Sequence, residues 1–176
     1  MLDEAPQTPH GPAGKVVSLA AGLSHLIACV LLLAVMFLVV ANVVGRRFLD
    51  QPVPGAQELV EVGIAALVWL GMGHAQLRGD HIIVDLLFHR AKPRVTALVD
   101  ALAYALCTLV GVVLVRQFVA YSGVMDRGGY ETAVWHVPVS AVALVCAAGA
   151  VVWTAALALE TAGAALTVLG KETTHA

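Results

Sequence analysis

Glu58 and Glu61 are the charged residues whose spacing could best support chemistry inside a membrane. They are three residues apart, so on a helix they share one face. A charge inside a bilayer costs at least about 2.5 kcal/mol, so such a pair could form a proton or cation site or contact a partner protein. The alternative is structural, because acids are stabilised in the first turn of a helix. Arg46 and Arg47 lie a short loop away and favour this second interpretation, an interfacial polar cluster.

Two histidines, His25 and His74, are predicted to lie at a similar depth near the same membrane face. Histidines at matched depth on neighbouring helices could ligate a haem, as in membrane cytochrome anchors. The alternative is that each one hydrogen-bonds a neighbouring helix or reaches the interface. Both interpretations stay open on the sequence alone.

Asp100 lies near the start of a third apolar segment. We expect it to pair with the basic residues at 90–94 or with a neighbouring subunit, or to extend toward the headgroups. The cysteines have no paired spacing, so we expect neither disulfides nor a metal site, and no cofactor bound by this chain. They lie in three different apolar segments: Cys29, Cys107 and Cys146.

The composition indicates which elements must position these residues. Hydrophobic residues make up 60% of the 176-residue chain and charged residues 12%, with a mean hydropathy of +0.87. An ordinary soluble domain has about 45–50% apolar residues, and one of this size cannot bury so much more. The net charge of −2 argues against a nucleic-acid partner. We therefore predict an all-α integral membrane protein, since lipid requires every spanning segment here to be helical.

Four apolar segments are long enough to cross a hydrocarbon core of about 30 Å. They are residues 17–44, 58–77, 95–115 and 133–159. We expect a disordered cytoplasmic tail (1–15), a four-helix transmembrane domain (16–160) and a cytoplasmic C-terminal tail (161–176). Small residues spaced by four predict close helix packing on the last two spans. These are Ala97, Ala101 and Ala105 on the third, and Ala143 and Ala147 on the fourth.

Lysines and arginines in the short loops indicate the orientation. A cytoplasmic N-terminus places six of them inside and four outside, so we predict that both termini are cytoplasmic. The six are Lys15, Arg78, Arg90, Lys92, Arg94 and Lys171.

The second span is followed by a break and a short amphipathic segment. Gly79 permits a sharp turn after Arg78. In the segment 81–87, Ile82, Ile83 and Leu86 would face lipid or a partner. This pattern predicts a short interfacial helix between the second and third spans.

Taken together, these segments resemble the small membrane subunit of tripartite ATP-independent periplasmic (TRAP) transporters, the DctQ-like small permease. The resemblance rests on residues 46–48, 52–61 and 68–71, and on Trp135-His136-Val137-Pro138 before the last span. Its most specific part is the segment 79–87, and the family motif at the interfacial helix comprises Arg78, Gly79, His81, Val84 and Asp85. Gln57 departs from the pattern, because a second acidic residue is expected beside Glu58.

The resemblance implies a non-catalytic scaffold subunit in the bacterial inner membrane. A large multi-span permease would hold the substrate and sodium sites, and the sodium gradient would drive uptake. A soluble periplasmic binding protein would deliver an organic acid, often a carboxylate. The polar residues of the chain would then be structural or face the partner: Arg46, Arg47, Glu58, Glu61 and Asp100.

Two other functions stay open on the residues alone. One is a haem-bearing membrane anchor subunit of a redox complex, which would use His25 and His74. The other is a small self-assembling exporter coupled to protons at Glu58 or Glu61. A self-contained enzyme is not expected, because the sequence has no Walker motif, dinucleotide fingerprint or nucleophile elbow.

Overall fold

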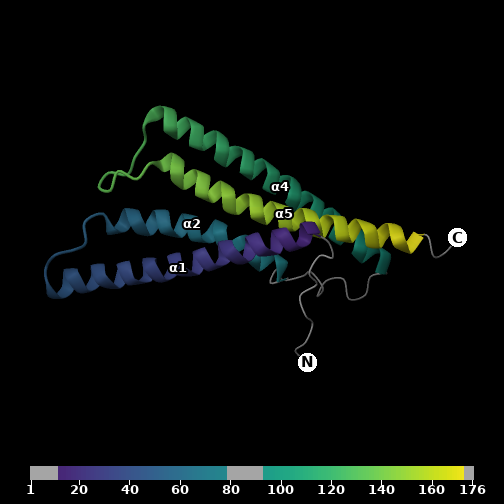
Figure 1. Cartoon of the computed structure of the whole chain (residues 1–176), viewed down its shortest axis with the longest axis horizontal. Coiled ribbons are helices and arrows are strands. Elements are labelled where there is room, and N and C mark those ends of the chain that lie inside the picture. The colour runs from purple at the N-terminus through teal and green to yellow at the C-terminus, as the bar shows by residue number, and fades with distance from the viewer. Residues whose placement is uncertain (1–11, 79–92, 173–176) are drawn as a thin grey trace, which may run out of the picture.

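The computed structural model describes residues 12–78 and 93–172, with side chains described except at 93–98, 100 and 164–172. Its helices are α1 (Pro12–Phe48), α2 (Ala56–Leu77), α4 (Pro93–Gly128) and α5 (Val139–Glu172), as Figure 1 shows. All four are long and apolar enough to cross a membrane. The predicted all-α fold with four spanning helices is confirmed, whereas the predicted interfacial helix at 81–87 lies outside the described residues.

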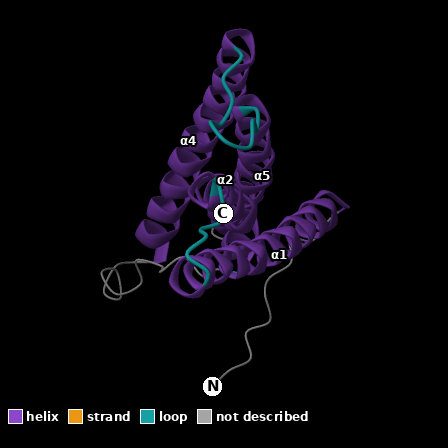
Figure 2. Ribbon diagram, turned by 90° about the vertical axis from the view of Figure 1, so that its left-hand side faces the viewer, coloured by secondary structure: helices purple, strands orange, loops and turns teal. Residues whose placement is uncertain are grey.

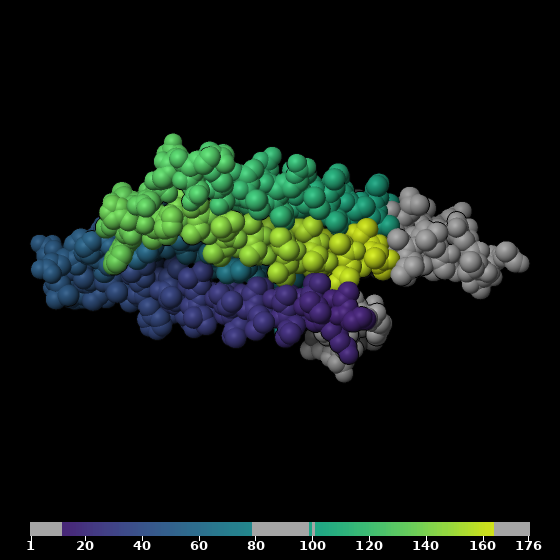
Figure 3. All heavy atoms as spheres, turned by 45° about the horizontal axis from the view of Figure 1, so that its top comes forward, coloured from purple at the N-terminus to yellow at the C-terminus, as the bar shows by residue number. Residues whose placement is uncertain are grey.

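Helices α2 and α5 form the centre of the bundle and run in the same direction. The Cys146 thiol contacts the carbonyl oxygen of Ala65 at 3.6 Å, and further along both helices the Trp153 indole donates to Gln76 at 3.2 Å. Helix α1 packs on α2, and α4 packs on α5. Figure 2 shows this arrangement from one end, and Figure 3 shows α5 lying between α4 and α1 on one face. Helices α1 and α4 are therefore the outer helices.

Small residues let the central helices approach closely, which drives helix association in lipid. A Cβ on Gly149 would lie 2.5 Å from the backbone carbonyl of Trp69, so α5 touches the backbone of α2 there. The predicted alanine stripe on α5 is buried, with Ala143 and Ala147 each 5% exposed. Of the stripe predicted on α4, Ala105 is exposed and Ala101 is half-buried, and the side chain of Ala97 lies outside the described set.

Hydroxyl groups and glycine replace alanine where α4 meets α5. Thr108 and Thr161 bond through their hydroxyls at 3.1 Å, and the Ser122 hydroxyl donates to the carbonyl oxygen of Ser140 at 3.0 Å. A Cβ on Gly111 would lie 2.5 Å from the Thr154 hydroxyl. These residues were not part of the predicted alanine stripe, and their hydroxyl groups add interhelical hydrogen bonds that alanine cannot make.

The helices end at different residues from the predicted spans. Helix α1 begins at Pro12, so residues 12–15 are helical, and α4 continues past residue 115 to Gly128. It stops where Gly129 takes a φ of 62°. Helix α5 begins at Val139, six residues later than predicted, and continues to Glu172. Hydropathy marks the apolar part of a helix, and the polar turns at its ends lie outside that signal.

Candidate functional site

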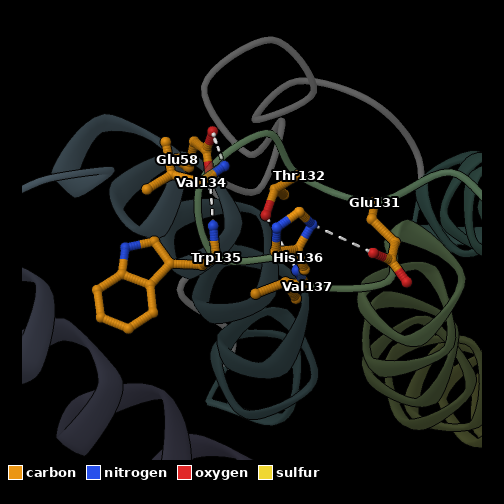
Figure 4. A network of polar contacts seen from close by, with 7 residues as sticks. All are labelled: Glu58, Glu131, Thr132, Val134, Trp135, His136 and Val137. Atoms are coloured by element: carbon orange, nitrogen blue, oxygen red, sulfur yellow. Dashed lines mark hydrogen bonds and ion pairs between the residues drawn. The ribbon is translucent and has the colours of Figure 1, made fainter.

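Glu58, in the first turn of α2, binds the loop between α4 and α5 (Figure 4). Its two carboxylate oxygens accept the Val134 N–H at 3.0 and 3.1 Å, and Oε2 also accepts the Trp135 N–H at 3.4 Å. The Trp135 indole in turn donates to the carbonyl oxygen of Pro54 at 3.0 Å. These contacts form a clamp, here called the Glu58 clamp, that joins the loops at this end of the bundle.

The loop before α2 is built to receive Trp135. Gly55 has a φ of 67°, a conformation that favours glycine, and a Cβ there would lie 2.5 Å from the indole Cδ1. The Val53 N–H donates to the side-chain oxygen of Asn42 at 3.0 Å, which ties this loop to the end of α1. A side chain at position 55 would push the indole out of the clamp.

A small turn in the loop between α4 and α5 presents the two amides to Glu58. The Thr132 hydroxyl accepts the Val137 N–H at 3.0 Å, and the Val137 carbonyl accepts the Thr132 N–H at 3.0 Å. The exposed His136 lies 3.4 Å from the Glu131 carboxylate (Figure 4). The turn is thus held by its own hydrogen bonds, so the amides of Val134 and Trp135 keep a fixed position.

The predicted cluster of arginines and glutamates is only partly brought together. Glu58 binds backbone amides, and in the described part of the chain no ion pair involves Arg46 or Arg47, which are exposed at the end of α1. Glu61 is exposed and accepts the Gln57 side-chain amide at 3.2 Å. The departure at Gln57 therefore adds a donor for Glu61.

The remaining predicted site residues are placed less completely. Asp100 lies within α4, but its side chain is outside the described set. Arg78 is exposed and caps α2, with its N–H donating to the carbonyl oxygen of His74 at 3.2 Å. The other motif residues lie outside the described residues: Gly79, His81, Val84 and Asp85.

A second polar layer joins α2 to α5 near the other end of the bundle. Gln76 is 5% exposed, and its side-chain amide donates to the Glu160 carboxylate at 2.6 Å. Its oxygen accepts the Trp153 indole N–H at 3.2 Å. The sequence analysis missed this layer because its residues carry no motif and are 84 positions apart. The available signal was an amide and a carboxylate interrupting two apolar helices.

His25 and His74 lie at the same depth, as predicted, and their rings meet between α1 and α2. Their rings stack face to face, with centroids 4.3 Å apart and planes 16° from parallel. Haem ligation by two histidines places the macrocycle between their ring nitrogens, and this stack has no space for it. The Cys29 thiol lies 3.6 Å from His25 Nε2. No group of three metal-ligating side chains occurs among the described residues.

The two polar layers are separated by the thickness of a bilayer core. Glu58 and Gln76 are 18 residues apart on α2, which corresponds to about 27 Å at 1.5 Å per residue. Ser140 and Glu160 are 20 residues apart on α5, or about 30 Å. A hydrocarbon core is about 30 Å thick. The Glu58 clamp and the Gln76–Glu160 contact therefore mark the edges of one apolar slab.

Four spanning helices with polar contacts at both edges of the slab suit a membrane subunit. The sequence model of the family described as "Tripartite ATP-independent periplasmic transporters, DctQ component" matches residues 35–167. The chain belongs to this DctQ family. The match covers the Glu58 clamp and the Gln76–Glu160 layer, and it confirms the predicted resemblance. No curated protein and no solved structure matches the chain. This chain is thus a multi-pass membrane component of the transporter family.

Proposed function

We propose that this chain is the non-catalytic small permease subunit of a sodium-coupled TRAP transporter that imports an organic acid. Its support is the DctQ family match together with the position of the polar groups. Secondary transporters bind their substrate near the midplane, at broken helices. Here Glu58 and Gln76 lie at the slab edges and join helices or loops of the chain to one another. We infer that a larger partner holds the substrate site.

In this proposal the chain acts as a scaffold in the bacterial inner membrane. The close contact at Gly149 and the two polar layers would fix α2 against α5, which suits a rigid part against which a partner moves. A large multi-span permease would hold the sodium and substrate sites and use the sodium gradient. A periplasmic binding protein would deliver the carboxylate substrate. The chain itself would bind no cofactor.

Reconstitution into vesicles tests the proposal. The tagged chain is co-expressed with a large TRAP permease, taken from the neighbouring genes if they encode one, and purified in mild detergent. The complex is then assayed with the binding protein. We expect co-purification, and uptake that requires this chain and an inward sodium gradient. Uptake by the permease and binding protein without this chain would refute the proposal. Transport by this chain alone would instead support a self-assembling exporter.

A further inference from the structure

A groove lies along α4 inside the apolar slab. It has a volume of about 380 Å³ and is lined by one helix face, namely Leu114, Gln117, Phe118 and Tyr121. Ser122 hydrogen-bonds Ser140 of α5 at the depth of the Glu58 clamp, and Gln117 comes five residues before Ser122 on α4. At 1.5 Å per residue, Gln117 therefore lies about 7.5 Å from the clamp toward the middle of the slab. The groove is therefore surrounded by hydrocarbon in a membrane.

An exposed stripe of α2 borders this groove. The Phe118 ring contacts the Trp69 ring edge-on, with centroids 4.9 Å apart, so the groove face of α4 adjoins α2. Ala65 lies one helical turn from Trp69 in the direction of the Glu58 clamp, and Glu61 lies one further turn in that direction. Both are exposed. Residues spaced by four are neighbours on a helix surface. The α4 pocket and the α2 stripe thus lie side by side through the Trp69–Phe118 contact. The surface that they form together is here called the α2–α4 groove.

Gln117 distinguishes this groove from an ordinary lipid-facing surface. The side chain is exposed, and no residue in the described part of the chain hydrogen-bonds it. A polar amide in hydrocarbon without a partner is costly. Acyl chains offer no donor or acceptor, whereas side chains of a neighbouring helix do. Arg116, on the opposite flank of α4, is also exposed, but its long side chain can extend to the headgroups.

Glu61 adds a charge to the same groove. Its exposed carboxylate is bonded only by the neutral Gln57 amide within the described chain. It comes three residues after Glu58, so it lies about 4.5 Å below the clamp. A helix seated in the groove would meet a carboxylate near its outer end and an amide somewhat deeper. The complementary chemistry is a lysine or arginine above a hydrogen-bonding residue.

We propose that the α2–α4 groove receives one transmembrane helix of the large permease subunit, with a basic residue facing Glu61 and a polar residue facing Gln117. This inference rests on the proposed function and specifies its interface. It leaves the outward surface of α1 and the far flank of α4 in contact with lipid.

Site-specific photocrosslinking in the co-expressed complex tests the occupant of the groove. Benzoylphenylalanine is placed at Ala65 or Leu114, and at Val119 as a control. Val119 is 52% exposed on the other flank of α4. We expect an adduct with the large permease from both groove positions and none from Val119. An adduct of two copies of this chain, or lipid adducts alone, would overturn the inference.

Variants provide a second measurement. Ala65→Trp fills the groove and should reduce the yield of co-purified permease at least about fivefold, the low end of overpacking effects. Gln117→Leu should reduce the yield of co-purified permease about threefold, which corresponds to the loss of one interhelical hydrogen bond in lipid. Val119→Trp should leave the yield unchanged, and all three chains alone should melt like the wild type. If groove variants co-purify as well as wild type, the groove assignment is wrong. If no permease co-purifies with the wild-type chain, both the proposed function and the groove assignment are wrong.

Discussion

Glu58 and Glu61 share a helix face, but their surroundings give them different roles. Glu58 accepts two backbone amides of a distant loop, whereas among the described residues Glu61 is bonded only by the Gln57 side chain. The acceptor in the Glu58 contacts carries a charge, which makes these hydrogen bonds stronger than bonds between neutral groups. The clamp is therefore a folding element, and Glu61 is free to interact outside the chain.

This difference predicts the effect of removing each carboxylate. Glu58→Ala should lower the melting temperature of the purified chain, because the Val134 and Trp135 amides lose a charged acceptor. Glu61→Ala should change stability by less than about 0.5 kcal/mol, as is usual for exposed side chains. Thermal unfolding in detergent measures both. We also expect Glu58→Ala to reduce the yield of the complex while the substrate's apparent affinity stays unchanged. Intact yield with altered affinity would contradict the folding role.

Gln76 on α2 and Gln117 on α4 provide a second comparison. Gln76→Leu removes the partner of both Glu160 and the Trp153 indole, so the isolated chain should lose about 1–3 kcal/mol. Gln117→Leu removes a side chain with no partner in the described chain, so stability should be unchanged or slightly higher. The melting temperatures of the two variants in the same detergent decide this. Equal melting temperatures would show that the Gln76 layer does not hold α2 against α5.

Helices α2 and α5 depend on a close approach at one glycine. A Cβ on Gly149 would meet the carbonyl carbon and oxygen of Trp69 at 2.5 Å, and backbone cannot rotate away as a side chain can. Gly149→Ala should therefore destabilise the chain by about 1–3 kcal/mol through overpacking. Gly22→Ala on α1 is the matched control, because its Cβ has no atom within 4 Å. That control should be neutral, or up to about 1 kcal/mol stabilising through helix propensity. A Gly149→Ala chain as stable as wild type would mean that the helices are not in backbone contact.

At the scale of the elements, hydropathy was enough to predict four spanning helices but not where they begin and end. The segment 133–138 reads as part of an apolar span, yet it forms the turn that Glu58 holds. Its attachment to α2 depends on a carboxylate 76 residues earlier in the chain. Local sequence cannot reveal that contact. The same reason explains the missed Gln76–Glu160 layer, whereas the similar depth of His25 and His74 could be predicted from their positions in the first two spans.

Across the whole molecule, the two polar layers define a slab but do not indicate which edge faces outward. The distribution of lysine and arginine indicates which edge faces outward, and it predicts that the Glu58 clamp lies at the periplasmic edge. A periplasmic binding protein would then approach the loop that carries His136 and Trp135. The choice between the two orientations also decides which end of the α2–α4 groove is near the periplasm.

Labelling of single cysteines tests this orientation. In a chain with Cys29, Cys107 and Cys146 replaced by alanine, His136→Cys and Lys15→Cys are compared, since both positions are exposed. A membrane-impermeant maleimide added to intact spheroplasts should label position 136 and should label position 15 only after permeabilisation. The cysteine-free chain controls for background. The reverse pattern would place the clamp in the cytoplasm, where no periplasmic protein could reach it, and would contradict a role beside a periplasmic binding protein.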